Sequence, residues 1–306
     1  MNRKAKESRR DFLKDVAVLS AAAAVVGAGL PGRAAETAPD LVVASGDDPK
    51  AMVKKVVAEL GGMKRFVSRG DVVVVKPNIG WEKSPEWAAN THPDVVVALI
   101  EMALDAGAKE VKVFDRSVRP APKCYAGSGI EEAAKKAGAR VLHVTDLAVA
   151  DLAVPKGRHL KKSSVYKDAI ECDCFINVPV AKHHVRSRLT LCMKNHMGIT
   201  ADDRGGVWHP QLDQVLADFA SAFAPKLNVL DAYRIVVDKG PNTGSLDFVK
   251  LTKKCIAGVN QASVDAYATV KLFDLPLEQV RHIALARELG VGEVDLAKLQ
   301  IRDVTA

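Results

Sequence analysis

The sequence predicts an α/β fold: a mostly parallel sheet with helices on both faces and βαβ repeats in the N-terminal half. Two observations lead to this prediction. Apolar runs of strand length alternate with segments of helical periodicity over residues 41–144, and the connections between them are short. The run Val72–Val75 is apolar without interruption, which is typical of a parallel strand buried on both faces. Right-handed crossovers between such strands place helices against the sheet.

Turn and capping signals mark where these elements end. Pro77-Asn78-Ile79-Gly80 follows an apolar run and predicts a turn after the strand. Thr91 is suited to cap a helix, and Pro93 to occupy its first turn. Because the working loops of a parallel sheet follow the carboxyl ends of its strands, residues 76–78 and 115–117 are expected to line one cleft. The N-terminal strands are expected at residues 41–45, 71–76, 110–115 and 140–144, and the helices at 49–60, 94–105 and 130–137.

The C-terminal half is less regular. Pro155, Gly157 and the basic patch Arg158–Lys162 predict a solvated loop over residues 151–167. The sheet resumes over residues 172–179. Further helices are expected at residues 212–223, 262–272 and 277–289, and strands at 226–231, 249–259 and 299–304. No repeat divides the chain after residue 40, so residues 36–306 are expected to form a single α/β domain.

The N-terminus has the features of an export signal. Ser8–Lys14 matches the pattern S-R-R-x-F-L-K of twin-arginine signals, and an Ala/Val-rich run follows over residues 16–30. We therefore expect residues 1–35 to be a signal peptide and the protein to be periplasmic or otherwise exported. The alternative is an amphipathic N-terminal helix that carries two arginines. The apolar run is too short for a comfortable membrane span, so no stable span is expected after signal cleavage.

Composition argues against a nucleic-acid partner. The formal net charge is +7, but residues 1–34 hold seven Lys/Arg and three Asp/Glu, which leaves 37 basic and 34 acidic residues and a net charge of +3. Aromatic residues make up only 5% of the chain, too few for a base-stacking surface. The five cysteines are an odd number, so at least one is expected to be unpaired.

A metal or redox site is the first hypothesis for the stretch Phe175–Pro210, which holds four of the eight histidines. Thiolates and imidazoles at this spacing suggest an iron–sulfur cluster or another transition metal such as zinc or nickel. The alternative is that the cysteines are small hydrophobic residues of a core strand. The identity of any cofactor therefore stays open. The candidate ligands are Cys172, Cys174, Cys192 and His196.

A small anionic ligand is the second hypothesis. Lysines after apolar runs, with asparagines beside them, suit phosphate or carboxylate, and solvated basic loops are the alternative. The candidate binding residues are Lys76, Asn78, Lys194 and Asn195, and the candidate catalytic residues are His184, Lys182, Asp115 and His92. A histidine near a carboxylate can serve as general acid or base. The chain has no G-x-S-x-G, H-E-x-x-H, P-loop or post-strand G-x-G-x-x-G motif, which disfavours common hydrolases, zinc proteases and nucleotide-triphosphatases.

The order of several motifs resembles the family known as domain of unknown function 362. These motifs are Val72–Asn78, Thr91-His92-Pro93, Phe175–Pro179 with Lys182 and His184, Leu191–Gly198, Leu230-Asp231-Ala232, Ser263–Ala266 and Gly290–Gly292. Members of this family often accompany iron–sulfur ferredoxin modules, so the resemblance implies a redox context. This chain has no C-x-x-C-x-x-C run of its own. The segmental pattern also bears a faint likeness to lactate racemase-type proteins, which carry a nickel cofactor.

Three classes of function therefore follow from the sequence. The first is an exported protein with a metal- or redox-linked site around residues 172–210. The second is an anion-binding enzyme or binding protein without a metal. The third is a non-enzymatic carrier or partner of a redox protein.

Overall fold

A computed structural model describes residues 38–306, which form one compact unit. The expected signal peptide, residues 1–35, lies outside this range. The main sheet has ten strands. They are β1 (Leu41–Ser45), β2 (Val72–Pro77), β3 (Glu110–Val113), β4 (Arg140–Val141), β7 (Cys174–Val178), β8 (Val180–His184), β9 (Arg188–Thr190), β10 (Leu227–Val236), β11 (Val249–Gly258) and β12 (Ile301–Thr305).

The sheet is mostly parallel, as predicted. Its order is β12-β1-β11-β10-β7-β2-β3-β4, with β8 paired to β10 and β9 paired to β8. The strands β4, β3, β2, β7 and β10 run in one direction. Strand β11 is antiparallel to both of its neighbours, and β12 runs parallel to β1. The α/β prediction is thus confirmed.

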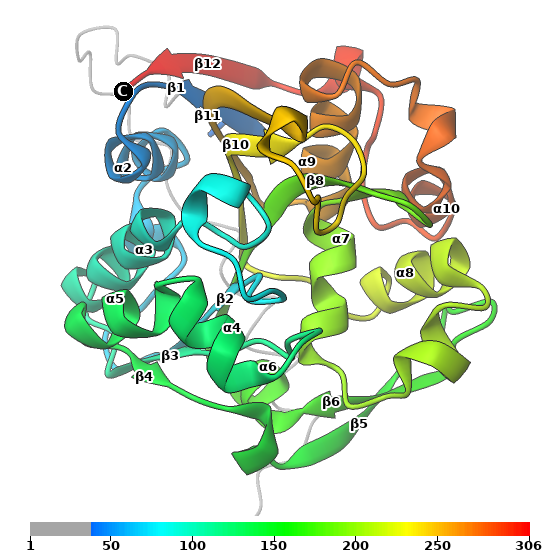
Figure 1. The fold of residues 1–306 in the computed structure, drawn as a ribbon, viewed down its shortest axis with the longest axis horizontal. Helices are drawn as coiled ribbons and strands as arrows, with labels where there is room; N and C mark the ends of the chain where they lie inside the picture. The colour runs from blue at the N-terminus through cyan, green and yellow to red at the C-terminus, as the bar shows by residue number, and fades with distance from the viewer. Residues whose placement is uncertain (1–37) are drawn as a thin grey trace, which may run out of the picture. The chain divides into compact units, whose positions relative to one another are not determined.

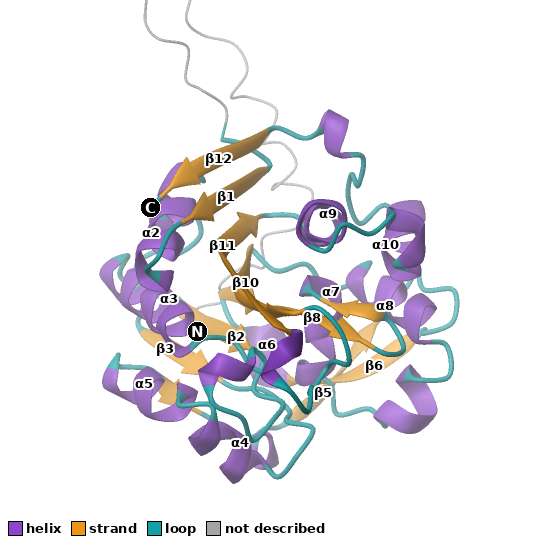
Figure 2. Cartoon of the chain, turned by 45° about the horizontal axis from the view of Figure 1, so that its top comes forward, coloured by secondary structure: helices purple, strands orange, loops and turns teal. Residues whose placement is uncertain are grey.

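Helices cover both faces of the sheet (Figures 1 and 2). The helices on one face are α2 (Pro49–Glu59), α3 (Pro93–Asp105), α4 (Ala121–Gly127) and α5 (Ile130–Lys136). The helices on the other face are α7 (Cys192–Asn195), α8 (Leu212–Ala220), α9 (Gln261–Tyr267) and α10 (Arg281–Glu288). Strand pleating divides the core between the faces. On β2, Val73 and Val75 pack with α2 and α3, whereas Val74 packs on the opposite face.

The expected solvated loop is present only at residues 154–161, which hold most of the basic patch, and not over the whole segment 151–167. This segment contributes to a two-stranded antiparallel hairpin, β5 (Val149–Ala153) and β6 (Lys162–Tyr166), followed by α6 (Lys167–Glu171). Pro155 and Gly157 lie in the connection. The hairpin escapes sequence patterning because β5 has one solvent-facing side and small residues, so it lacks a strong apolar alternation. Its partner strand buries Val165 against Phe114 and the other residues of one core cluster.

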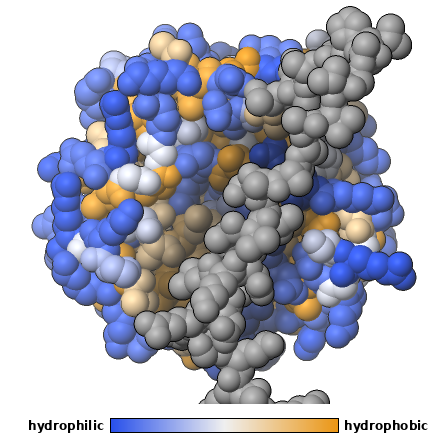
Figure 3. Space-filling model, turned by 180° about the vertical axis from the view of Figure 1, so that it is seen from behind, coloured by the Kyte–Doolittle hydropathy of each residue, from blue (hydrophilic) through white to orange (hydrophobic). Residues whose placement is uncertain are grey.

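The segment after Pro179 remains part of the main sheet. It continues as β8 and turns back as β9, an antiparallel pair in which Lys182 lies opposite Thr190. Within residues 38–306, no helix combines the length and apolar character needed to cross a membrane. Seen from behind, the periphery of the molecule is mainly hydrophilic, with apolar residues showing between polar ones (Figure 3).

Candidate functional site

A cavity of about 240 Å³ lies at the carboxyl ends of β2 and β3, between β8 and α7. This is the edge at which ligands bind in parallel α/β sheets. The cavity brings together six of the residues that the sequence singles out: Asn78, Asp115, Lys182, His184, Lys194 and Asn195. They come from four separate segments, and the fold is what places them side by side.

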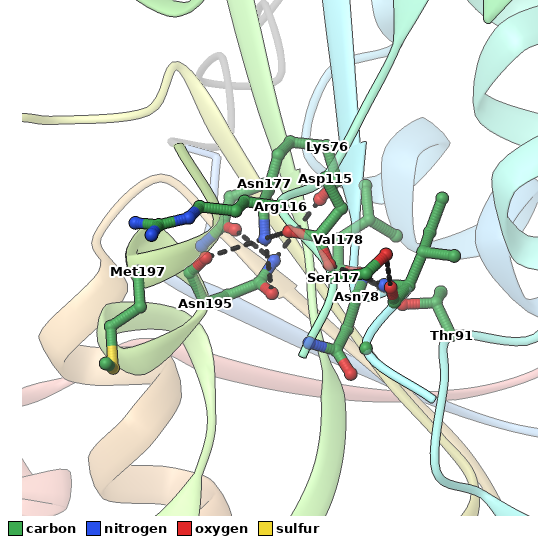
Figure 4. A network of polar contacts seen from close by, with 12 residues as sticks. Lys76, Asn78, Thr91, Asp115, Arg116, Ser117, Asn177, Val178, Asn195 and Met197 are labelled. Carbon is green, nitrogen blue, oxygen red and sulfur yellow. Dashed lines mark hydrogen bonds and ion pairs between the residues drawn. The ribbon is translucent and has the colours of Figure 1, made fainter. Parts of the chain in front are cut away.

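A buried ion pair forms the floor of the site (Figure 4). The Lys76 Nζ lies 2.9 Å from the Asp115 Oδ1, and both side chains are almost completely buried. Lys76 also donates to the backbone oxygen and the Oδ1 of Asn195, at 2.6 and 2.7 Å. Burial lowers the pKa of Lys76, and the Asp115 carboxylate opposes that shift. Lys76 therefore has a structural partner on each side, and it does not line the cavity itself.

A row of asparagine side chains fixes the orientation of Asn195. The Asn195 Nδ2 donates to the Asn177 Oδ1 at 2.9 Å, and the Asn177 Nδ2 donates to the Asn228 Oδ1 at 3.0 Å. The three residues lie on α7, β7 and β10 and are fully or almost fully buried. Because the Asn195 Nδ2 is bound to Asn177, the Asn195 Oδ1 faces the Lys76 ammonium group. Asn195 thus acts as a support of the ion pair.

Lys182 lies on β8 and reaches across the cavity entrance to a different segment. Its Nζ donates to the Asn78 Oδ1 at 2.8 Å and to the Ala89 backbone oxygen. Only 2% of the residue is exposed. Burial, with the nearby Lys194 charge, lowers the pKa of Lys182 to about 7. Lys182 therefore exchanges its proton near neutrality while its contacts hold it in place.

Of the four basic side chains that line this cavity, Lys194 makes the fewest polar contacts within residues 38–306. Within residues 38–306, the polar contact of its Nζ is with the Met197 Sδ at 3.4 Å, a weak acceptor. Burial, with the nearby charges of Arg204 and Lys76, lowers the pKa of Lys194 to about 7. The residue is partly exposed to the cavity. An amine in this state can hold a proton or release it at neutral pH, and a bound anion would favour the protonated form.

The short helix α7, which carries Lys194, is anchored by Asp265 of α9. The two Asp265 carboxylate oxygens accept the backbone N–H groups of Cys192 and Met193, at 2.7 and 3.0 Å. These are N–H groups of the first helical turn that have no partner within the helix. Burial raises the pKa of Asp265 to about 6. Asp265 does not line the cavity, so its role is to position α7.

His184 faces the cavity in a defined tautomer. Its Nδ1 accepts the backbone N–H groups of Arg186 and Ser187, at 3.1 and 3.2 Å. The proton of the neutral ring is therefore assigned to Nε2. Burial and the neighbouring lysine charges lower the pKa of His184 to about 2. His184 is thus a neutral hydrogen-bond donor at the cavity wall, and the low pKa makes it unsuited to act as an imidazolium acid.

Arg116 and Arg204 complete the cationic lining. Arg116 donates to the backbone oxygens of Thr200 and Asp202, at 2.9 and 2.6 Å. Arg204 donates to the backbone oxygens of Met197, Ser117 and Arg116, and its Nε is buried without a hydrogen-bond partner. Both guanidinium groups thus bind carbonyls of loops at the cavity. The cavity lining holds four cations and one carboxylate, which is already paired.

Sequence reasoning missed several residues of the site. Trp81 and Thr190 line the cavity and carried no local motif. Arg204 and His209 also line it; they belong to the histidine-rich stretch Phe175–Pro210 but were not among the candidate site residues. Gly198 is also required there, because a Cβ at this position would lie 1.8 Å from the Asp115 Oδ1 and 2.5 Å from the Lys76 Nζ. The run Lys194–Gly198 offered only a weak signal, a glycine that ends a short segment of polar residues and one methionine. Its contact with Asp115 depends on the tertiary fold.

The structure places the candidate catalytic residue His92 outside the cavity lining. It is the N-cap of α3, and its Nδ1 accepts the backbone N–H of Asp94 at 3.2 Å. Its backbone N–H donates to the Asp231 Oδ2 at 2.7 Å. The ring packs edge-on against Tyr233, with 5.8 Å between centroids. These contacts describe a capping residue.

The four candidate metal ligands are not brought together. Cys174, Cys192 and Cys172 pack in three different apolar clusters. Cys172 follows α6 as its C-cap and does not belong to β7, so it does not share a strand face with Cys174. His196 is fully buried against Phe219 and Phe223. Across residues 38–306, no group of three or more His, Cys, Asp or Glu side chains is arranged to hold a metal ion.

The fold and the cavity define a class of protein: an α/β protein with a small basic cavity at the carboxyl edge of its parallel strands. The chain belongs to the family described as domain of unknown function (DUF362), whose model matches residues 73–270. The matched region contains each of the cavity residues named above. The family resemblance seen in the sequence is confirmed.

Two known proteins are similar to the chain. The thylakoid-associated protein sll1697 of Synechocystis sp. is 27% identical over 207 residues, which cover 63% of this chain and 61% of that protein's length. The lactate racemase apoprotein of Thermoanaerobacterium thermosaccharolyticum gives a TM-score of 0.41 at 13% identity, over 71% of this chain and 54% of the racemase chain. A structural likeness of this size supports no statement about activity.

Proposed function

We propose that the protein binds a small organic anion, a carboxylate or a phosphate ester, in the cavity between β8 and α7. The observation that carries the proposal is the unbalanced charge of the lining. The lining contains four basic side chains and one carboxylate, that of Asp115. This carboxylate is already paired with Lys76, which lies outside the lining. Among the described residues, 38–306, no acidic side chain pairs with Lys194. An anion that entered would supply the missing countercharge and would be shielded from water, which strengthens the attraction.

The same residues suit proton transfer to or from the bound anion. Lys194 has a pKa of about 7, so both its protonated and neutral forms are populated at neutral pH, as general acid–base catalysis requires. The neutral His184 ring offers its Nε2–H as a fixed donor to a ligand oxygen. Lys182 holds the Asn78 and Ala89 segment in place. We propose Lys194 as the proton-transfer group and His184 as an orienting donor.

The twin-arginine pattern of Ser8–Lys14 supports a site of action outside the cytoplasmic membrane. The anion is then proposed to be a solute of the exported compartment. A comparison of tagged protein in periplasmic and cytoplasmic fractions, with an Arg9→Lys/Arg10→Lys variant as control, tests this part. Retention of the wild-type protein in the cytoplasm would contradict it.

Calorimetric titration with inorganic phosphate, acetate and pyruvate tests anion binding. We expect at least one of these probes to bind, with proton uptake that appears as a dependence of the heat on the buffer's ionisation enthalpy. Lys194→Met should weaken binding by about tenfold or more, since charged hydrogen bonds contribute roughly 1.5–3 kcal/mol. Lys54→Met, on the exposed side of α2, is the matched control and should leave affinity unchanged. Equal affinities in the wild type and Lys194→Met would refute the proposal.

A further inference from the structure

A second depression, the basic groove, opens directly beside the cavity. It has a volume of about 390 Å³ and is lined by Trp81, Glu82, Lys83, Arg119, Lys123 and Asn242. Trp81 lines the cavity and the groove at once. Two further segments border both, because Val118 and Pro241 line the cavity while the next residues of the chain, Arg119 and Asn242, line the groove. The two depressions are therefore neighbours along three separate segments.

The wall between them is held firmly by the buried side chain of Asn90. The Asn90 Oδ1 accepts the backbone N–H groups of Gly80 and Trp81, at 2.9 and 3.0 Å. Its Nδ2 donates to the backbone oxygens of Trp81 and Lys83, both at 2.9 Å. One amide thus satisfies four backbone groups of the segment that carries Trp81 and Lys83. Such a segment is ordered before any ligand arrives, which reduces the entropic cost of binding.

The charge of the groove repeats that of the cavity. Three basic side chains, Lys83, Arg119 and Lys123, stand against the single carboxylate of Glu82. No ion pair joins any of these four residues to another charged side chain among the salt bridges of residues 38–306. The Arg119 guanidinium lies 5.9 Å from the Trp81 ring centroid, so the indole is the apolar surface between the two basic regions.

Asn242 adds an unused acceptor. Its Oδ1 is buried and has no hydrogen-bond partner in the part of the chain that the structure describes, residues 38–306. An unpaired buried amide oxygen is costly. The groove thus contains a cationic region and an aromatic wall.

We propose that the cavity and the basic groove are two subsites for one elongated organic dianion, with an anionic group at each end and an apolar body against Trp81. This inference rests on the proposed function, since the first anionic group occupies the cavity. The second group binds Arg119 and Lys123 in the groove, where phosphate or carboxylate would suit the guanidinium.

Matched series of straight-chain acids test the proposal by calorimetry on the full chain. The dicarboxylates run from succinate to sebacate, and each is compared with the monocarboxylate of the same length. We expect one or two dicarboxylate lengths to bind about tenfold or more tightly than their monocarboxylates, because a second charged contact is added. Trp81 fluorescence, isolated in a Trp87→Phe/Trp208→Phe background, should change with the longer acids.

Variants of the groove separate this inference from the proposed function. Arg119→Ala and Lys123→Ala, both exposed positions that should fold, are expected to remove the dicarboxylate advantage and to leave monocarboxylate affinity unchanged. Lys54→Ala is the control with no effect on either series. Two outcomes would refute the two-subsite inference alone. In the first, the monocarboxylates bind and each dicarboxylate binds no more tightly than the monocarboxylate of the same length. In the second, a dicarboxylate does bind more tightly, but Arg119→Ala and Lys123→Ala leave that difference in affinity unchanged. If neither series binds, the proposed function fails with it.

Discussion

The Asp115 Oδ1 lies 2.9 Å from the Lys76 Nζ, directly against the Cα of Gly198. A side chain at position 198 would enter the space between them. The floor of the cavity therefore depends on a glycine as well as on the two charges. This relationship couples the stability of the fold to the geometry of the site.

Gly198→Ala should destabilise the protein. The added methyl would lie 1.8 Å from the Asp115 oxygen, so the ion pair must move. We expect the free energy of unfolding to fall by about 1–3 kcal/mol, the usual cost of overpacking, and by more if the pair separates. Gly244→Ala is the control, since nothing lies within 4 Å of its added Cβ. Denaturant unfolding measures both, and an unchanged midpoint for Gly198→Ala would contradict the geometry.

Stability should rise with pH above neutrality. The pKa of Lys182 is about 7 in the folded protein and 10.5 is its ordinary value, so between these values the unfolded chain binds more protons than the folded one. The free energy of unfolding therefore increases with pH in this window, by up to about 1 kcal/mol per pH unit for a fully buried lysine. Lys194 acts in the same direction with a smaller weight, because it is partly exposed.

The measurement is urea unfolding between about pH 7 and 8.5. Unfolded thiols, whose ordinary pKa is about 8.5, begin to lose protons at the upper end of this range, but they do so equally in the wild type and in the lysine variants. Lys182→Met should flatten the slope in that window. Lys54→Met, an exposed lysine, is the control and should preserve it. A slope that is the same in wild type and Lys182→Met would show that Lys182 keeps an ordinary pKa in the folded state.

Replacing Lys194 by methionine should stabilise the protein while it weakens anion binding. The ammonium is desolvated by the cavity and meets no acidic group, so an apolar side chain of similar length removes an unfavourable charge. We expect a gain of roughly 1–2 kcal/mol at pH 6, where the lysine is protonated, and a smaller gain at pH 8.5. A loss of stability at pH 6 would mean that Lys194 has a countercharge in the folded protein.

Sequence patterning located the sheet and much of the site because both depend on local signals. Lys76 and Asp115 end apolar strands, and Lys182 and Lys194 follow apolar runs, so their position at the carboxyl edge follows from the strand order. The roles of these residues could not be predicted from the sequence. Lys76 is a buried structural charge because Asp115 and Asn195, both distant from it in the sequence, contact its ammonium group. Among residues 38–306, no carboxylate contacts the ammonium group of Lys194 in the same way.

The cysteines show why the metal hypothesis went beyond what spacing can support. Two residues two apart share a face only if both lie in the strand. Strand β7 begins at Cys174, so Cys172 belongs to the end of α6 and packs on the other side of the sheet. The beginning of a strand is set by its neighbours, here the pairing of Cys174 with Val73, and local sequence does not contain it.

Removing the anchor of α7 should loosen the site without touching its lining. Asp265→Ala leaves the backbone N–H groups of Cys192 and Met193 without acceptors in a buried place. We expect a loss of about 1–3 kcal/mol in the free energy of unfolding and a weaker affinity for the anion that binds the wild type. Asp265→Asn, which keeps one acceptor, should restore part of both. Asp295→Ala removes a similar cap at an exposed 3-10 turn and should cost less than about 1 kcal/mol.

The thiols offer a test of the separated cysteine positions. Cys124, Cys174, Cys192 and Cys255 are buried and Cys172 is partly exposed, and all five are free within residues 38–306. Burial raises the pKa of Cys172 to about 12, so little thiolate forms at pH 8. Titration with a chromogenic disulfide should therefore detect at most one slowly reacting thiol in the native protein and five in guanidinium. Cys172→Ser should abolish the native reaction, whereas Cys255→Ser should not. Rapid reaction of two or more native thiols would show that the cysteines are less deeply packed than the fold requires.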